Sequence, residues 1–291
     1  MKYPDFLEVT SLVDDDILLV HQASTMQLKK IKLSTLKQYI GVATTPSYSV
    51  EATAVINAIQ ATGVTLTTTQ KEACNSRIVS MKTAGVWAKR IAYYGFLGGT
   101  ANAHAINWKS PGTYNITWIG NMTHNFSGIA SDGITGYGDT GLTESLFNQA
   151  STHISIYSRS KDSYERHRDV GTISGDGLQL IIAFLGSSYY RSFFTQTGLE
   201  NVPPPSEIGY FIATRNGTNA AMYRNATAYI NNASSADGIG QPGNIAVCRA
   251  STDYTARQIA SIGLGSGLTQ TEVTNDFNSE QAYQNALTRV V

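Results

Sequence analysis

Charged side chains are scarce in this sequence. Asp, Glu, Lys and Arg make up 14% of the 291 residues, and the 21 basic and 21 acidic side chains cancel. A chain without net charge has no long-range field that would draw it to nucleic acid or to an anionic membrane surface. We therefore expect no nucleic-acid partner, and a surface made mainly from uncharged residues that hydrogen-bond.

Long apolar runs and cysteines are also lacking. No run approaches the roughly 18 apolar residues of a membrane-spanning helix, and the start MKYPDFLEV has no signal-peptide core. We expect that the protein is made in the cytosol and does not insert into a membrane. Cys74 and Cys248 stand far apart and form no CxxC motif, so we predict two buried free thiols.

The strongest signal for a sheet lies at residues 208–230. Phe211, Ala213 and Arg215 alternate with other side chains before Asn216-Gly217, and a second run follows. An Asn-Gly pair supplies the two positive φ angles of a type I′ turn, which suits the twist of paired strands. We predict a β-hairpin here, with a plain surface loop as the alternative.

Residues 1–45 form a distinct module with expected strands at 17–20 and 27–31 and a helix that begins at Ser34. The module is too small to hold its own core, so it should be stable only against a partner. The stretch VTSLVDDDILLVHQASTMQLKKIKLSTLKQYI resembles the N-terminal segment of tailed-phage fibre proteins. The resemblance implies a virion-attachment end that contacts other virion proteins. An ordinary hairpin and helix fused to a domain is the alternative.

Residues 46–88 are predicted to form a helical neck. Apolar residues recur at helical spacing in 50–61 and 69–84, and Gly63 and Gly85 follow these runs as helix ends. The two helices either cap the domain that follows or bundle around a symmetry axis. The sequence leaves that choice open.

Residues 89–291 consist of short apolar or aromatic runs separated by turn dipeptides. Many short strands without intervening helices predict a mainly β fold, a two-sheet antiparallel β-sandwich. The expected strands are 90–96, 105–108, 116–118, 123–126, 134–137, 153–159, 166–171, 179–184, 189–194, 208–214, 220–224, 226–230, 245–249 and 257–264.

The end of the chain predicts a strand, a turn and a final helix. Thr269 is the expected N-cap, and Glu272 stands at the capping-box position. IASIGLGSGLTQTEVTNDF, HISIYSRS and the 208–230 hairpin resemble the concanavalin A-like lectin/glucanase superfamily, in particular its laminin-G-like branch. The resemblance covers about residues 90–291 and implies a concanavalin A-like jelly roll.

Catalytic motifs are missing. Glycosidases of this shape carry two close carboxylates, often as E-x-D-x-x-E, and the sequence has no such run. Glu144, Glu165 and Glu207 are isolated, and Asp162 lies with Glu165 in a charged stretch typical of a solvated loop. No GxSxG elbow or phosphate-binding Gly-rich loop is present. We predict no enzymatic activity and no cofactor.

Metal-binding patterns are weak. Asp132, Asp139 and Asp237 lie in Gly-rich loops of the type that binds calcium, but without EF-hand spacing. The five histidines show no zinc-ligand spacing. We predict no metal site.

Glycan binding would depend on aromatic rings that stack on sugar faces and on polar groups that bind sugar hydroxyls. The chain has 16 Tyr against 9 Phe, and Tyr keeps a polar tip at the surface. Half-buried strand positions are the alternative role for each ring. The candidate glycan-binding residues, in or beside loops, are Tyr137, Tyr164, Tyr189, Tyr190 and Tyr223.

Together these features predict a bacteriophage virion protein, a head or tail fibre whose β-sandwich binds a host or mucosal glycan without cleaving it. Fibres of the resembling family imply a homotrimer. The alternatives are a structural capsid-decoration or tail protein without a ligand, and a polysaccharide depolymerase. Exposure of the sandwich loops on the particle separates the first two, and a pair of close carboxylates in a groove indicates the third.

Overall fold

The computed structural model describes residues 17–22, 27–32, 47–148, 150–162, 167–175, 177–184, 187–191, 199–202, 204–233 and 241–291. The chain divides into two compact units, Met1–Ser47 and Tyr48–Val291. The predicted division at residues 45 and 88 into attachment, neck and sandwich domains stays a prediction.

The first unit contains an antiparallel hairpin of β1 (Ile17–Gln22) and β2 (Gln27–Lys32), in which Ile17 pairs with Lys32 and Gln22 with Gln27. Both strands predicted there are confirmed. The helix predicted from Ser34 lies outside the described residues.

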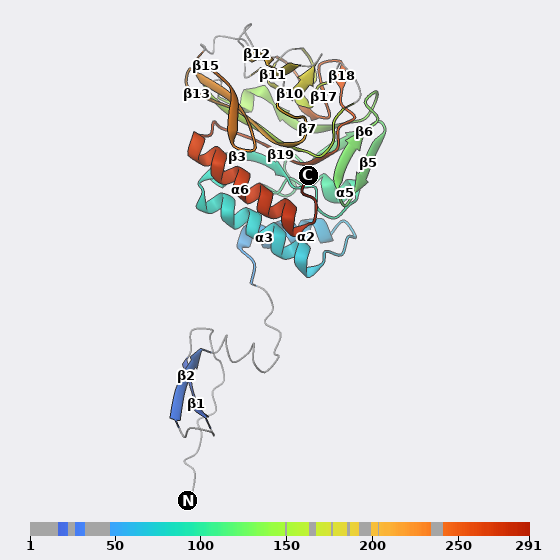
Figure 1. Ribbon diagram of the computed structural model, residues 1–291. Coiled ribbons are helices and arrows are strands. Elements are labelled where there is room, and N and C mark those ends of the chain that lie inside the picture. The colour runs from blue at the N-terminus through green and yellow to red at the C-terminus, as the bar shows by residue number, and fades with distance from the viewer. Residues whose placement is uncertain are drawn as a thin grey trace, which may run out of the picture. The chain divides into compact units, whose positions relative to one another are not determined.

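The second unit is a β-sandwich of two sheets (Figure 1). The predicted mainly β, jelly-roll-like sandwich is therefore confirmed. One sheet has the order β12 (Leu199–Val202), β11 (Ser187–Arg191), β10 (Gln179–Phe184), β9 (Val170–Thr172), β16 (Asn244–Val247), β7 (Tyr137–Thr143) and β4 (Thr117–Ile119), joined by β17 (Arg249–Ala250) and β18 (Asp253–Tyr254). The other has the order β15 (Thr227–Ala233), β14 (Asn219–Arg224), β13 (Gly209–Asn216), β8 (Ser151–Ser158), β19 (Ile259–Gly265), β6 (Gly128–Ser131) and β5 (Met122–Asn125), with β3 (Arg90–Tyr94) paired to β19.

Successive side chains of the eight-stranded sheet point to opposite faces, so this sheet contributes to two hydrophobic cores. Phe211 and Ala213 of β13 pack toward the other sheet, whereas Tyr210 and Ile212 pack on the opposite side. That opposite side, the outer face, is covered by helices. Each side of this sheet is therefore buried over much of its area.

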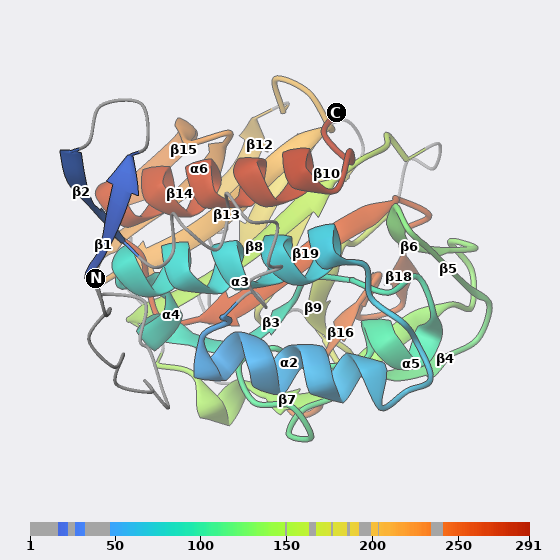
Figure 2. The same cartoon turned by 90° about the horizontal axis from the view of Figure 1, so that it is seen from below.

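Three helices lie side by side over the outer face: α2 (Val50–Gln60), α3 (Thr68–Thr83) and α6 (Gln270–Ala286) (Figure 2). Short helices α4 (Val86–Lys89), α5 (Ala101–His104) and η1 (Glu144–Leu146) lie in the connections. The predicted helices of 50–61 and 69–84 are confirmed, and Gly63 and Gly85 follow them with φ angles of 91° and 74°. The predicted helical pair thus caps the sandwich.

The predicted hairpin is confirmed, but its turn is not of type I′. Asn216 pairs with Asn219, so the two turn residues are Gly217 and Thr218, and of these Gly217 has a positive φ of 60°. That pattern fits a type II′ turn, with Gly in the first position. The next hairpin has positive φ at both Asn225 and Ala226, as a type I′ turn requires.

Two predicted strands are wrong. Residues 105–108 follow α5, whose start is capped by Thr100, and Ala105 still has a helical φ of −70°. Residues 134–136 form a loop, because the Asp132 carboxylate accepts hydrogen bonds from the backbone N–H groups of Ile134, Thr135 and Gly136. Those N–H groups therefore do not pair with a strand.

Candidate functional site: a neutral polar groove beside the last helix

A polar groove of about 430 Å³ lies on the outer face, where β13 to β15 meet the start of α6. We call it the amide groove. Its lining residues are Thr214, Asn216, Asn219, Ala221, Tyr223, Asn231, Leu268, Thr269 and Gln270. Segments far apart in the sequence thus share one concave surface.

Strand alternation sets which side chains reach this groove. Along β14, Ala220 and Met222 point into the core between the sheets, whereas Ala221 and Tyr223 lie on the outer face. Asn231 of β15 pairs directly with Ala221, so it shares that face. An aromatic ring and an amide are therefore presented by neighbouring strands.

The start of α6 is fixed by a capping box. Thr269 Oγ1 accepts from the Glu272 N–H at 3.3 Å, and Glu272 Oε2 accepts from the Thr269 N–H at 2.7 Å. Partial burial would raise the pKa of Glu272, but hydrogen bonds from Lys89 and Thr269 hold it below its ordinary value. The cap holds the exposed Gln270 at the rim of the groove, where its Nε2 also donates to Ala226 O at 3.3 Å.

The inner wall is held rigidly. The Leu268 N–H donates to Thr214 Oγ1 at 2.7 Å, and Asn216 Nδ2 donates to Leu268 O at 2.5 Å. These bonds join β13 to the chain entering α6. A wall fixed in this way loses little freedom when a ligand binds.

Other polar groups of the groove are available to a ligand. Among the described residues, nothing hydrogen-bonds to the side-chain amides of Asn219 and Asn231 or to the Tyr223 hydroxyl. Asn219 and Asn231 are exposed, and Tyr223 is 8% exposed. Burial raises the pKa of Tyr223, so its hydroxyl stays neutral and can both donate and accept.

The groove is uncharged. None of its lining residues is Asp, Glu, Lys, Arg or His, as far as the described part of the chain shows. Amides and hydroxyls that donate and accept in all directions are complementary to a neutral ligand rich in hydroxyls. Such a lining offers no general acid or base at neutral pH.

The structure describes the side-chain surroundings of two of the five predicted tyrosines, Tyr223 and Tyr137. Tyr223 lines the amide groove. Tyr137 lies on the other sheet, half-buried under the Arg249 guanidinium at 4.7 Å and edge-on to Tyr254. Tyr189 and Tyr190 belong to β11, but their side chains are not described, and Tyr164 lies outside the described residues. A glycan-binding role for each of the five stays a prediction.

Sequence reasoning missed Asn219, Asn231 and Gln270. Asn219 lies two residues after the predicted Asn216-Gly217 turn, and Gln270 directly follows the predicted N-cap Thr269, so both had a local signal. Asn231 had none, because only the pairing of β15 with β14 brings it to the groove.

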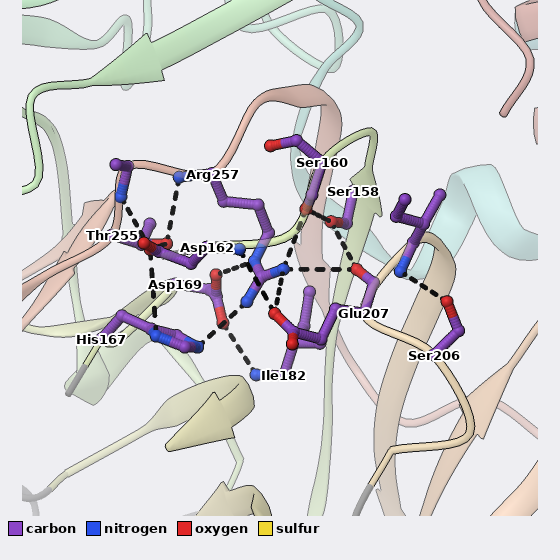
Figure 3. Close-up of polar contacts among 12 residues, drawn as sticks. Ser158, Ser160, Asp162, His167, Asp169, Ile182, Ser206, Glu207, Thr255 and Arg257 are labelled. Atoms are coloured by element: carbon purple, nitrogen blue, oxygen red, sulfur yellow. Dashed lines mark hydrogen bonds and ion pairs between the residues drawn. The ribbon is translucent and has the colours of Figure 1, made fainter. Parts of the chain in front are cut away.

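A second polar cluster joins residues that seemed isolated in the sequence (Figure 3). The buried Arg257 donates from Nε to Asp169 at 2.8 Å and from Nη1 to Glu207 at 3.0 Å. Its Nη2 donates to His167 Nε2 at 3.0 Å, which requires that nitrogen to carry no proton. Asp162 accepts from Thr255 Oγ1 at 2.6 Å.

The cluster holds the fold together. Asp169 also accepts from the Ile182 N–H at 2.7 Å, and Asp162 from the Ala256 N–H at 2.8 Å. The side chains of Asp162 and Asp169 are buried and accept hydrogen bonds from donors of the chain itself, and neither lines the amide groove. These hydrogen bonds and ion pairs link several loops to one another. The carboxylates are not placed as an acid and a base facing a substrate.

The candidate calcium loops are closed by their own hydrogen bonds. Asp132 accepts from three backbone N–H groups and from Thr135 Oγ1, and these bonds hold its pKa below the ordinary value. Asp139 accepts from the Gly141 N–H and from Asn244, and Asp237 lies outside the described residues. Within the part that the structure describes, no three His, Cys, Asp or Glu side chains are grouped as a metal site requires.

Two further sequence features have a place in the structure. Cys74 and Cys248 are buried free thiols in different cores, one beneath the helices and one between the sheets. Among the described helices, none is both long and apolar enough to cross a lipid bilayer.

No protein-family profile and no curated protein sequence matches this chain. Solved structures with partial likeness include a Trypanosoma rangeli sialidase in complex with a difluoro-KDN, at 8% identity and a TM-score of 0.48 over 71% of this chain and 39% of that chain. Domain 4 of AbnA, a GH43 extracellular arabinanase from Geobacillus stearothermophilus in complex with arabinotriose, gives 12% identity and 0.48 over 65% of this chain and 98% of that chain. The botulinum neurotoxin serotype D binding domain has 14% sequence identity and a TM-score of 0.49, over 66% of this chain and 52% of that chain.

This chain thus spans about two fifths of the sialidase chain and about half of the toxin binding domain. With TM-scores below 0.5, these likenesses carry no information about what this chain binds or does.

Proposed function

We propose that this protein is a bacteriophage fibre subunit whose β-sandwich binds a host-surface or mucosal glycan in the amide groove without cleaving it. The observation that carries the proposal is the convergence of Asn219, Asn231 and Tyr223, whose polar side-chain groups have no hydrogen-bond partner among the described residues. They meet in one uncharged groove of about 430 Å³.

A neutral sugar fits this chemistry. Its hydroxyls both donate and accept, as do the amides of Asn219, Asn231 and Gln270, and its C–H faces pack on apolar surface such as the Tyr223 ring. The volume falls within the range of about 300 to 1,000 Å³ that is typical of small-molecule sites. We expect weak binding by one subunit and stronger binding by several copies together.

We propose binding without cleavage because the described residues that line the groove include no carboxylate. Glycoside hydrolysis ordinarily uses two carboxyl groups placed on either side of the scissile bond. Described carboxylates that come together elsewhere are held by donors of the chain. Asp162, Asp169 and Glu207 are held by Arg257, Thr255 and backbone N–H groups. Asp276 and Glu280 are held by Arg77, and Arg90 also contacts Asp276. We therefore expect no depolymerase activity.

The virion role rests on the sequence of residues 1–45, which resembles the attachment end of tailed-phage fibres. We propose that this end binds other virion proteins and that the fibre is a homotrimer. Light scattering on the purified chain tests the trimer, with an expected mass of three times the 31.4 kDa chain. A monomer at micromolar concentration would contradict it.

The glycan proposal is tested on a glycan array with the wild-type chain, the double variant Asn219→Ala/Asn231→Ala and the matched control Asn278→Ala/Asn285→Ala. The control residues are exposed on α6 and outside the groove. We expect wild type and control to bind the same neutral glycans, and the groove variant to lose at least about 1.4 kcal/mol, which is tenfold in affinity. Equal binding by all three, or no binding at all, would contradict the proposal.

A further inference from the structure

A second groove, of about 310 Å³, lies at the far end of α6 from the amide groove. We call it the arginine groove. Its walls come from the first turn of α3, the residues after β3, the turn between β5 and β6, and the end of α6. The lining residues that matter here are Thr69, Phe96, Phe126, Leu287, Thr288 and Arg289.

Arg289 is a buried cation that no described carboxylate neutralises. The residue is 3% exposed, and its guanidinium donates to Gln284 Oε1 at 2.9 Å, Phe96 O at 3.0 Å and Gly95 O at 3.3 Å. Among the described residues, no carboxylate lies within 4 Å of it. By contrast, Arg77 and Arg257 each contact two carboxylates at 2.8 to 3.0 Å.

This difference has an electrostatic consequence. Burying a charge is costly unless an opposite charge is close, and neutral carbonyls compensate only in part. Arg159 adds positive charge nearby, since its Nε donates to Arg289 O at 2.9 Å and no described carboxylate lies within 4 Å of it either. An anion in the groove would therefore be stabilised by Arg289.

The end of α6 fixes Arg289 in place. Thr288 has a left-handed φ of 55°, and the Arg289 N–H donates back to Gln284 O at 2.8 Å. This is the geometry of a helix end that turns the following residue back against the helix. The guanidinium is thus held at the groove rather than extended into solvent.

Phe126 supplies a flat apolar face. It is 72% exposed, at the turn between β5 and β6. One side of the ring rests on Gly99, where an added Cβ would lie 3.2 Å from Phe126 Cδ1. An exposed ring supported from one side presents its other face to solvent, and that face suits stacking on the C–H face of a sugar.

We propose that the arginine groove binds a sugar that carries a carboxylate. The carboxylate pairs with Arg289, the ring stacks on Phe126, and the Thr69 hydroxyl at the positive first turn of α3 faces the ligand. The volume is at the lower end of the range for small-molecule sites and suits one sugar unit. The choice of a sugar acid over another carboxylate whose ring stacks on Phe126 rests on the proposed glycan-binding function.

The test uses the full chain and ligand-observed NMR with the methyl glycosides of glucuronic, galacturonic and N-acetylneuraminic acids, each beside its methyl ester. At least one acid is expected to bind about tenfold more tightly than its ester. Phe126→Ala should abolish this binding, whereas the exposed apolar control Ile134→Ala should keep it. Arg289→Lys should weaken it about tenfold, because lysine lacks the planar fork.

The proposal is overturned if every acid and its ester bind equally, or if Phe126→Ala binds the acid as wild type does. Binding of an acetylated hexaglutamate peptide in place of all sugar acids would overturn it too, in favour of an acidic protein partner. Because Arg289→Lys can disturb folding, the ester comparison and Phe126→Ala decide the outcome. Asn219→Ala/Asn231→Ala should leave acid binding unchanged, which separates a failure here from a failure of the amide groove.

Discussion

The Arg77 guanidinium on α3 donates to the Asp276 carboxylate on α6 at 2.8 Å, and both side chains are fully buried. Arg77 also contacts Glu280 at 2.8 Å, and Arg90 reaches Asp276 from the sheet at 2.5 Å. Burial would raise the pKa of Asp276, but Arg90 and Arg77 hold it below its ordinary value. This ion cluster joins the helices to the sheet that forms the amide groove.

We predict that Arg77→Met destabilises the fold by about 3 to 5 kcal/mol, because Glu280 is left buried without its arginine. The matched control is Lys82→Met, which removes the exposed Lys82 pair with Glu51 and should cost less than about 1 kcal/mol. Urea unfolding measures both. Similar losses in the two variants would contradict a structural role for the buried cluster.

The hairpin turn offers a test of backbone strain. Gly217→Val places a β-branched residue at a φ of 60°, although an added Cβ there meets nothing within 4 Å. We expect a loss of about 1 to 3 kcal/mol in the free energy of unfolding from conformation alone. Thr218→Val, at the neighbouring residue without positive φ, should change it by less than about 0.5 kcal/mol. An unchanged midpoint of thermal unfolding in Gly217→Val would contradict the claim that this turn requires glycine.

Stability should fall as pH falls below about 6.5. Burial lowers the pKa of His104 and of His153 to about 3, helped by His124 for the first and Arg90 for the second. The unfolded chain then binds protons from pH 6.5 downward while the folded chain does not, so each histidine removes about 1.4 kcal/mol per pH unit. His124, whose pKa burial also lowers, acts in the same direction.

Denaturant unfolding between pH 6.5 and 5.5 isolates this effect, because Glu51 and Glu272, whose lowered pKa values start from an ordinary 4.5, stay ionised there in both states. The carboxylates with lowered pKa, such as Asp276 and Asp132, lose their contribution only when pH falls below their ordinary value of 3.8. His104→Gln should make the slope of stability against pH less steep. An unchanged slope would show that His104 is not buried as a neutral ring.

Removing a tyrosine hydroxyl should lower the stability of the fold at Tyr93 but weaken glycan binding at Tyr223. The Tyr93 hydroxyl donates to Glu280 at 2.7 Å and accepts from Arg77, so Tyr93→Phe should cost about 1 to 3 kcal/mol of stability. Tyr223→Phe should leave the free energy of unfolding within about 0.5 kcal/mol, because that hydroxyl has no partner among the described residues. It should instead weaken glycan binding about fivefold. Loss of stability without loss of binding in Tyr223→Phe would contradict a ligand-binding role.

Local signals in the sequence predicted local structure well. The Thr269 cap with Glu272, the helix ends at Gly63 and Gly85, and the strands on both sides of Gly217 depend on neighbouring residues alone. The two wrong strands also have local causes, because the Asp132 carboxylate and the Thr100 cap take up backbone N–H groups that an apolar pattern does not reveal.

Non-local pairing was not predictable. The placement of β8 between β13 and β19 depends on how distant strands associate. No single segment of the sequence carries a pattern that predicts this pairing. For the same reason, no sequence pattern indicates that Arg257 joins Asp169 to Glu207, or that Asn231 lies beside Tyr223. A groove whose walls come from β14, β15 and α6 can be seen only after the sheet is assembled.

The most direct test of the central claim is an NMR titration of the ¹⁵N-labelled chain with the neutral glycan selected on the array. The side-chain amide signals of Asn219, Asn231 and Gln270 are followed, with those of Asn278 and Asn285 on the exposed side of α6 as reference. We predict saturable shifts of the first three signals and none of the reference pair. Shifts confined to residues outside the amide groove, or no saturable shifts, would contradict it.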